Sequence, residues 1–539
     1  MLDGGVRFRL AENAISPERY RSVTAMAELF LPLERLLSAG GDPRLTISPV
    51  SGLNEYGCRS YPCPETLSFS SSTATSISQR GYDCAHGARE ALMRSAIADG
   101  IEAAFDNRIE AMRDELRAYL GLSPATADVV FSPSGTDAQL QALFLVRARF
   151  GAALTTVIVG AEQTGSGTVH TARGCHFSAA AANGGRVRKG EPIAGLAHSL
   201  ECIGVRLFDE MGQPRSQNAC DAIVLSAVEK AVAGGRKVLL QAMDSSKLGW
   251  RAPSDSCLDE IARRWPQQVQ LVIDACQMRL GRARLRNYLD RGYMVIITGS
   301  KFFTGPPFSG ALLVPSALAP ALDGANTIPS GLLEYASRSD WPRNWPNLRS
   351  HFPVRNNFGQ WLRWEAALEE IGAYYRVPSE FRFNALTTFG GNVERIIGAS
   401  PSLLLLPPQQ KPGDGGSDDE EMSQRTIFPF TIRYGGRVLG LGECKALYRA
   451  LASEIDLGQA TVAKPCLIGQ PVALGEQPQA AALRISAGAR LITEAFSPEE
   501  NLARDHLRRA VDDVGTVVAR LEQLLADKGQ QFAETAHGN

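Results

Sequence analysis

Short runs of apolar residues alternate with helical patterns between about residue 124 and residue 320. In the segment 137–150, for example, Leu140, Leu143, Phe144 and Val146 recur at helical spacing. The pattern predicts strands at 129–131, 155–159, 237–243, 269–274, 294–298 and 311–314, and helices at 137–150, 222–233 and 256–264. Strands separated by helices need crossover connections, so we expect an α/β fold with a mostly parallel sheet covered on both faces.

This alternation is lost after residue 320. There the pattern predicts a long helix at 361–376, strands at 425–433 and 481–486, and a second long helix at 501–528. We therefore expect a large domain over residues 61–320 and a smaller α+β domain over 321–539. Residues 1–60 form an N-terminal extension to which the sequence assigns no function. Residues 407–424 (PPQQKPGDGGSDDEEMSQ) are acidic and rich in Gly and Pro, which is typical of a flexible loop.

Composition limits the classes of function. Lys plus Arg number 56 and Asp plus Glu 57, and a formal charge of −1 argues against a dedicated binder of nucleic acid or anionic membranes. No apolar run approaches the roughly 18 residues that cross a bilayer, and the first ten residues lack the apolar stretch of a secretory signal. The ten cysteines form no CxxC pair, and the seven histidines show no metal-ligand spacing. We expect a cytoplasmic protein without a metal site.

The first candidate site is a turn between a predicted strand and a predicted helix. Ser134, Gly135 and Thr136 bring free backbone amides, hydroxyl groups and the positive end of the helix to one place, which suits a phosphate. Ser and Thr also cap helices without binding a ligand, and this alternative is equally open. The sequence contains no GxxxxGK[ST] motif, which argues against a nucleoside-triphosphate loop.

Asp274 and Lys301 follow two later strands. Asp274 ends a buried strand where open α/β sheets bind ligands, and a buried carboxylate needs a cation such as a protonated pyridine nitrogen. Lys301 stands just past the next strand among small residues, where a partly desolvated amine can form an imine with an aldehyde. Each has an ordinary alternative: Asp274 as the cap of the next helix, and Lys301 as a solvated surface amine.

The order and spacing of these three groups match the phosphate, the ring nitrogen and the aldehyde of pyridoxal 5′-phosphate (PLP). Residues 65–320 and scattered later segments resemble the fold type I PLP-dependent enzymes. The motifs Asp274-Ala275-Cys276-Gln277 and Thr298-Gly299-Ser300-Lys301 resemble those of the class V aminotransferase and cysteine desulfurase branch. The resemblance implies that PLP is the cofactor and that residues 61–320 are the domain that binds it.

The resemblance also implies a role for each residue. Lys301 would hold the cofactor as an aldimine and carry the Cα proton of the substrate, Asp274 would pair with the pyridinium nitrogen, and Gln277 would hydrogen-bond the ring hydroxyl. The residues implied to grip the phosphate are Ser134, Gly135, Thr136, Thr298 and Ser300. At the position of Ser300 the family usually has His, so this contact departs from its pattern.

The residue that would stack on the cofactor ring is open. The family often places a His after the strand at 155–159, where this chain has the run 160–164 (GAEQT), and we take Thr164 there as a cofactor-binding residue. His176 is a rival by similarity to the decarboxylase branch, and its alternative is a partly exposed loop histidine. The segment 67–78 (LSFSSSTATSIS) resembles the one that lines the substrate side in the class V branch.

Two residues near the C-terminus complete the predicted site. Arg484 resembles the arginine that clamps the substrate carboxylate, because a guanidinium fits a carboxylate with two parallel hydrogen bonds. The alternatives are a solvent-facing strand residue, or a clamp formed by Arg490. Cys466 precedes Arg484 as the persulfide cysteine does in cysteine desulfurases, where a thiolate attacks the substrate sulfur. The apolar residues after Cys466 instead favour a strand with a buried cysteine.

These residues predict an enzyme that acts on an α-amino acid. A class V aminotransferase-like or cysteine-desulfurase-like transferase is the leading interpretation. A carbon–sulfur lyase or an amino-acid decarboxylase is the alternative reaction, and a catalytically inactive scaffold with this fold is the alternative of another class. The resemblance also implies a homodimer, in which residues 355–358 are a candidate cross-subunit segment.

Overall fold

The computed structural model describes residues 17–151, 153–325, 327–409, 417–452, 464–475 and 480–535. The helices are α1 (Pro17–Leu29), α2 (Leu33–Leu37), α3 (Gln79–Asp99), α4 (Ile101–Tyr119), α5 (Gly135–Phe150), α6 (Thr168–Ala172), α7 (Gln217–Ala233), α8 (Asp255–Arg264), α9 (Arg282–Asp290), α10 (Ala319–Asp323), α11 (Pro346–Ser350), α12 (Phe358–Arg376), α13 (Ser379–Ala399), α14 (Leu441–Ala452), α15 (Ala489–Ala495) and α16 (Glu500–Thr535). The strands are β1 (Leu67–Phe69), β2 (Ala127–Ser132), β3 (Leu154–Val159), β4 (Leu200–Val205), β5 (Lys237–Met243), β6 (Val269–Asp274), β7 (Met294–Thr298), β8 (Gly310–Pro315), β9 (Leu403–Leu405), β10 (Ile427–Tyr434), β11 (Arg437–Val438), β12 (Cys466–Leu474) and β13 (Ala480–Ser486).

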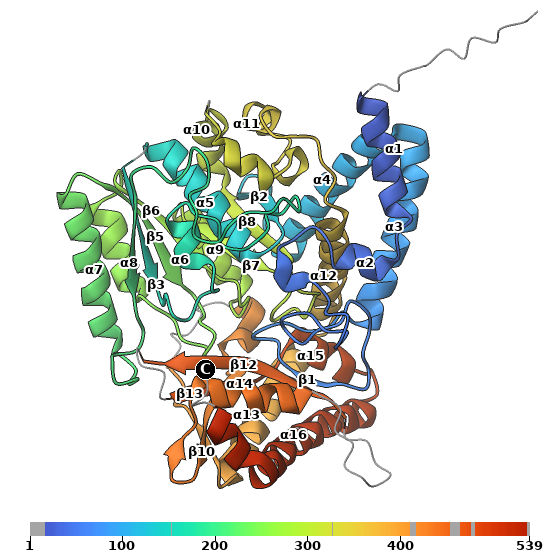
Figure 1. Ribbon diagram of the computed structural model, residues 1–539, viewed down its shortest axis with the longest axis vertical. Coiled ribbons are helices and arrows are strands. Elements are labelled where there is room, and N and C mark those ends of the chain that lie inside the picture. Colours follow the sequence, from blue (N-terminus) through green and yellow to red (C-terminus); the bar gives the residue numbers. More distant parts are fainter. Residues whose placement is uncertain are drawn as a thin grey trace, which may run out of the picture.

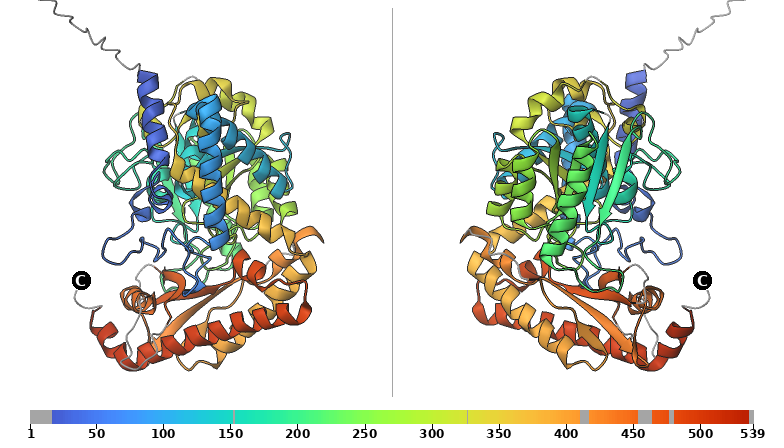
Figure 2. Two further views of the ribbon diagram at one scale, coloured as in Figure 1. Left: turned by 90° about the vertical axis from the view of Figure 1, so that its right-hand side faces the viewer. Right: turned by 90° about the vertical axis from the view of Figure 1, so that its left-hand side faces the viewer.

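A large body built around one sheet lies above a smaller body, and α16 runs along the base of the smaller one (Figures 1 and 2). The large sheet has seven strands in the order β2-β8-β7-β6-β5-β3-β4. The pairs from β7 to β4 are parallel, while β8 runs antiparallel to both of its neighbours. The predicted α/β fold class, with a mostly parallel large sheet and a smaller α+β domain, is confirmed.

Both faces of the large sheet are buried, which explains the uninterrupted apolar runs in its strands. In β8, Ala311 and Leu313 belong to one hydrophobic core, and Leu312 and Val314 belong to the other. Helix α5 packs on the second face, whereas α7, α8 and α9 contribute residues to the first core. Because each successive side chain of a strand points to the opposite face, apolar residues predominate in these strands, although Thr156 of β3 and Gln241 of β5 are also buried there.

The carboxyl ends of the parallel strands meet at one edge of the sheet. The register pairs Met243 at the end of β5 with Asp274 at the end of β6, and Asp274 with Ile296 near the end of β7. Loops that follow these ends are therefore neighbours in space, although they are far apart in the sequence. This edge faces the smaller body, because Arg484 and Gln470 of the small sheet line the same cavity as Asp274.

The smaller sheet has six strands in the order β1-β12-β13-β10-β11, with β9 beside β10. Strand β1 comes from the residue range predicted for the large domain, yet it pairs in parallel with β12. Conversely, α12 follows residue 320 but packs against α3 and α4 of the large body. The predicted boundaries at residues 61 and 320 are therefore wrong for these two elements.

The described part of the N-terminal extension, residues 17–60, is packed against the large body. Helix α2 lies on α12, where the buried Arg363 donates hydrogen bonds to the carbonyl oxygens of Leu37 at 3.0 Å, Gly40 at 3.1 Å and Phe308 at 2.8 Å. At Gly359 a Cβ atom would lie 2.2 Å from the carbonyl oxygen of Ala39, so only glycine permits this approach. Residues 17–60 of the extension are thus an integral part of the fold.

Part of the segment that the sequence predicted as a flexible loop is ordered. Ser417–Ser423 forms a short 3-10 helix, while residues 410–416 lie outside the described ones. Asp419 accepts from Arg282 at 2.9 Å, and Glu421 pairs with Arg382 at 2.8 Å. The prediction was wrong for residues 417–424 because partners distant in sequence bind these carboxylates. Within the described ranges, no helix is both long and apolar enough to cross a membrane.

Candidate functional site

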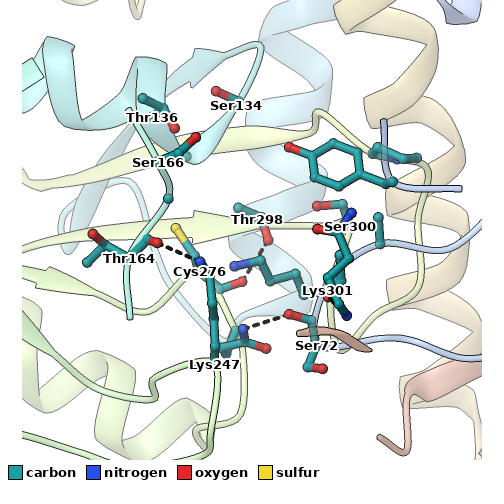
Figure 3. Close-up of a pocket in the computed structure, with 18 of the residues that line it drawn as sticks. Ser72, Ser134, Thr136, Thr164, Ser166, Lys247, Cys276, Thr298, Ser300 and Lys301 are labelled. Carbon is teal, nitrogen blue, oxygen red and sulfur yellow. Dashed lines mark hydrogen bonds between the residues drawn. The ribbon is translucent and has the colours of Figure 1, made fainter. Parts of the chain in front are cut away.

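A cavity of about 290 Å³ lies between the carboxyl edge of the large sheet and the small sheet. The predicted site residues that line it are Ser134, Gly135, Thr136, Thr164, Asp274, Gln277, Thr298, Ser300, Lys301 and Arg484. Figure 3 shows the hydroxyl-bearing residues Ser134, Thr136 and Ser166 gathered at one end of this cavity. The structure therefore brings together stretches that are separated by up to several hundred residues.

The proposed phosphate cup is the first turn of α5. Ser134 is the N-cap of this helix: its hydroxyl accepts from the Asp137 amide at 3.2 Å and donates to the Asp137 carboxylate at 2.5 Å. The backbone amides of Gly135 and Thr136 bond to no acceptor in the described part of the chain. The capping interpretation is thus correct for Ser134, and the two amides beside it provide the donors that an anion at a helix N-terminus needs.

Asp274 is a buried carboxylate, 8% exposed, at the end of β6. Its oxygens accept from the Cys276 amide at 3.1 Å and from the side-chain amide of Gln139 at 3.2 Å. No cationic side chain among the described residues lies within ion-pairing distance of it. Asp274 does not cap the next helix, because α9 begins only at Arg282. A buried carboxylate without a cation is costly, so this position suits a protonated ring nitrogen.

Gln277 lines the cavity, and one atom of its side-chain amide has no hydrogen-bond partner among the described residues. Its amide nitrogen donates to the Ser72 carbonyl oxygen at 3.0 Å, whereas its amide oxygen is buried and has no hydrogen-bond partner among the described residues. The open atom is an acceptor, so Gln277 would accept a hydrogen bond from a ring hydroxyl. Ser72 belongs to the segment 67–78, and Ser72, Thr73 and Ala74 all line the cavity, where the sequence predicted the substrate side.

Lys301 lies in the loop that follows β7, half-buried at the wall of the cavity. The Thr298 hydroxyl donates to the Cys276 carbonyl oxygen at 2.7 Å and so ties the ends of β6 and β7 together. At Gly299 a Cβ atom would lie 2.6 Å from the Cβ of Ala367, so glycine lets the loop pack tightly on α12. These two features fix the position from which Lys301 projects.

Arg484 is a buried cation, 1% exposed, on β13. Its guanidinium donates to the hydroxyls of Thr73 at 2.8 Å and Ser72 at 3.3 Å, and to the Gln470 carbonyl oxygen. Burial lowers its pKa to about 9, so it still carries its charge at neutral pH. Gly469 makes room for it, because a Cβ there would lie 2.8 Å from Nε of Arg484.

Two alternatives for the substrate side are settled by position. The solvent-facing alternative for Arg484 is wrong, because the residue is buried and lines the cavity. Arg490 does not line this cavity, and its guanidinium donates to the carbonyl oxygens of Ser76 and Thr304, both at 2.9 Å. Of the two arginines, only Arg484 lines the cavity that holds the other predicted site residues, whereas Arg490 lines a separate one.

Cys466 is not part of the site, which corrects the prediction of a catalytic thiol there. It begins β12, pairs with Leu67 of β1, and its Sγ lies 3.4 Å from the Lys464 carbonyl oxygen. Burial raises the pKa of the Cys466 thiol, which disfavours the thiolate. The residues after Cys466 form a strand rather than a loop, and this strand places the thiol inside the small body.

His176 also lies outside the cavity. Its Nδ1 is 2.7 Å from the hydroxyl of Tyr335, and the two rings are stacked at 5.8 Å between centroids. His176 thus lies apart from the other predicted cofactor-binding residues, and its position fits the alternative of a partly exposed loop histidine. The run 160–164 is in place instead: Thr164 lines the cavity, and so does Gln163, whose amide oxygen and nitrogen are both buried without a partner among the described residues.

Sequence reasoning missed several lining residues. Lys247 follows the end of β5, and the rule that ligands bind at the carboxyl ends of strands would have found it. Cys276 also lines the cavity, although burial and the charge of Asp274 raise its pKa well above the ordinary value. Arg44 and Tyr56 come from the N-terminal extension, where no sequence signal marked them.

The cavity lining is polar enough to bind a small ligand that carries several polar and charged groups. Buried polar atoms without a hydrogen-bond partner among the described residues are found on Gln139, Gln163, Thr168, Ser245 and Gln277. Such atoms are rare in protein interiors unless a ligand or water meets them. Together with two free amides, an unpaired carboxylate and an amine, they fit the phosphate, ring nitrogen, ring hydroxyl and aldehyde of PLP.

No family model matches the sequence, and no curated protein matches it. Among solved structures, the fold is similar to the cysteine desulfurase CsdA from Escherichia coli, at 13% identity over 85% of this chain and 95% of that chain, with a TM-score of 0.48. It is also similar to the tryptophan decarboxylase of Catharanthus roseus in complex with L-tryptophan, at 16% identity over 77% and 76%, with a TM-score of 0.44. The Oryza sativa protein TDC, solved with PLP, is similar at 13% identity over 87% and 86%, with a TM-score of 0.48.

Proposed function

We propose that this protein is a PLP-dependent enzyme of fold type I that acts on an α-amino acid. The observation that carries the proposal is the convergence on one cavity of the free amides at Gly135 and Thr136, the unpaired carboxylate of Asp274 and the amine of Lys301. Each group alone has an ordinary explanation. Arranged around a cavity of about 290 Å³, they match the phosphate, the ring nitrogen and the aldehyde of one cofactor.

Bound PLP would supply an electron sink for the bond that breaks at the substrate Cα. Asp274 would keep the ring nitrogen protonated, and the first turn of α5 would hold the phosphate. Lys301 would bind the aldehyde carbon until the substrate amine displaces it, and would then be free to carry the Cα proton. The extension and the segment 67–78 would restrict the access of water to this proton transfer, because both contribute to the cavity wall.

We infer that the reaction retains the substrate carboxylate, as a class V aminotransferase-like transferase would. Arg484 is a buried cation whose bonded partners, among the described residues, are two hydroxyls and one carbonyl oxygen. A carboxylate bound there is stabilised in its charged form, which raises the barrier to its loss as CO₂. This favours transamination or β-elimination over decarboxylation. Cys466 begins β12 and does not line the cavity, which argues against its use as the thiol of a desulfurase.

The cofactor assignment is tested by a covalent readout. After incubation with PLP, the wild type should show a visible absorbance band that borohydride bleaches, and mass spectrometry should locate the reduced cofactor on the peptide containing Lys301. Lys301→Ala should lack this link, while Lys230→Ala, which removes an exposed lysine on α7, should retain it. A wild type that takes up no PLP would instead support the inactive scaffold.

The reaction is tested by product analysis with the PLP-loaded wild type and a panel of amino acids. Release of a 2-oxo acid that retains every carbon atom and the side-chain substituent, without CO₂ or ammonia and with the amino group passed to an added 2-oxo acid, would support the transferase. Release of CO₂ would contradict it and favour the decarboxylase, whereas β-elimination would release the side-chain substituent together with ammonia. The homodimer remains a prediction, and sedimentation of the loaded protein checks it.

A further inference from the structure

Lys247 is a second amine in the cavity, and the proposed function gives it no task. It follows β5 in a loop at the same sheet edge as Asp274. Its ammonium donates to the Thr164 carbonyl oxygen at 2.7 Å, and Figure 3 shows this contact on the side of the cavity opposite the loop that bears Lys301. In the part of the chain that the structure describes, no carboxylate lies within ion-pairing distance of it.

The charges that face Lys247 come from four different segments. Arg484 on β13 has the strongest effect among the cations, followed by Lys301 after β7 and by Arg44 of the extension, while Asp274 at the end of β6 is the opposing anion. Arg44 is already paired with Asp42, and Lys301 and Asp274 are assigned to the cofactor. Lys247 and Arg484 are thus left as two cations that line one cavity without an anion between them among the described residues.

Both cations also have hydrogen-bond donors to spare. The ammonium of Lys247 has three donors, and one is used on Thr164. The guanidinium of Arg484 has five, and three are used on Ser72, Thr73 and Gln470. Two like charges that face one cavity repel each other, and an anion bound between them removes that repulsion.

We propose that Lys247 and Arg484 together bind the carboxylate of the amino-acid substrate, so that Lys247 is a second substrate-binding residue of the site. This inference rests on the proposed function. It explains why a lysine lies at a wall of the cavity where the cofactor already has its own amine and its own carboxylate. A carboxylate in this place would accept the spare donors of both side chains.

The proposal also sets a pH dependence. In the free cavity, burial and the charge of Arg484 lower the pKa of Lys247 to about 7. A bound carboxylate favours the ammonium and raises this pKa, so binding above pH 7 must take up a proton. The affinity for a carboxylate is therefore expected to be constant below about pH 7 and to fall, by up to about tenfold per pH unit, as the pH rises above it.

Two small reagents can be compared to measure how much a carboxylate contributes to binding. Aminooxyacetate and O-methylhydroxylamine both condense with a carbonyl group, but only aminooxyacetate carries a carboxylate. Their apparent dissociation constants are measured from the change in visible absorbance of the PLP-loaded protein. Lys247→Met should weaken the binding of aminooxyacetate roughly 10- to 100-fold, the range of a hydrogen bond to a charged group, and leave O-methylhydroxylamine unchanged. Lys247→Arg should recover most of the difference, and Lys230→Met is the matched surface control.

The outcomes separate this inference from the function on which it rests. Equal loss for both reagents, or no loss for either, would overturn the role of Lys247 while leaving PLP in place. A wild type that responds to neither reagent would overturn the proposed function, and the role of Lys247 with it. If Lys247→Met fails to fold, the wild type alone tests the proposal. Its affinity for aminooxyacetate, divided by its affinity for O-methylhydroxylamine, must then fall above about pH 7. A ratio that stays constant with pH contradicts the proposal.

Discussion

At the scale of single residues, Asp137 links the proposed phosphate site to pH. It lies in the first turn of α5, and burial raises the pKa of its carboxyl from 3.8 to about 7. The folded chain therefore holds a proton that the unfolded chain releases near pH 4. The stabilising contribution of this proton is complete below about pH 4 and is lost as the pH rises through about 7.

Asp137→Asn should therefore flatten the stability profile. We expect the free energy of unfolding of the wild type to fall between about pH 4 and pH 7 by at most about 4 kcal/mol through this group. In Asp137→Asn that fall should be absent, because an amide cannot release the proton. Urea unfolding of the PLP-free protein at pH 5 and at pH 8 measures both slopes, and equal slopes in the two proteins would contradict the assignment.

The predicted site residues of the large sheet lie at or just after strand ends, whereas Arg484 lies within β13 and Cys466 begins β12. Asp274 and Lys301 could be placed because parallel strands end at one edge, whatever packs around them. Lys247 obeys the same rule but lay in no motif that singled it out. Arg44 reaches the cavity through tertiary packing of the extension, which no local pattern encodes. The catalytic role of Cys466 could not be judged from sequence, because its spacing to Arg484 is the same whether it lies in a loop or begins a strand.

At the scale of elements, periodicity sufficed wherever a segment is buried by its own apolar side chains. The strands β5, β6 and β7 have the predicted bounds because both of their faces are covered. The acidic segment 417–424 has no such periodicity and was assigned to a loop from its composition. It is ordered because Arg382 of α13 and other distant residues pair with its carboxylates, an interaction between elements rather than within one.

Asp419→Asn tests this account of the acidic segment. Asp419 is 4% exposed and lies 2.9 Å from Arg282 and 3.5 Å from Arg382, so its loss leaves a buried cation less compensated. We expect the free energy of unfolding to fall by about 3 kcal/mol. Asp505→Asn, which breaks an exposed pair with Arg508 on α16, should change it by less than about 1 kcal/mol. Similar losses in denaturant unfolding for the two variants would show that the segment is a solvated loop.

At the scale of the whole molecule, the cavity is a property of three parts of the chain that must stay assembled. The large sheet supplies the residues proposed to bind the cofactor, the small sheet supplies Arg484, and the N-terminal extension supplies Arg44 and Tyr56. Strand β1 and helix α12 each cross from their own part of the sequence into the other body, so the two bodies are interlocked. Closure of the site therefore depends on packing between segments far apart in the chain.

Arg363 is the residue by which this assembly can be tested. Its guanidinium is buried and satisfies carbonyl oxygens on both the extension and the loop after β7, at Leu37, Gly40 and Phe308. In Arg363→Met these oxygens lose their donor, so we expect a loss of about 2–4 kcal/mol of stability and release of the extension. Limited proteolysis should then cut between residues 38 and 60 in the variant and not in the wild type. Because Arg44 and Tyr56 leave the cavity wall when the extension detaches, the variant should also lose bound PLP faster on dialysis. Unchanged cleavage together with unchanged PLP retention would mean that α2 holds the extension without Arg363.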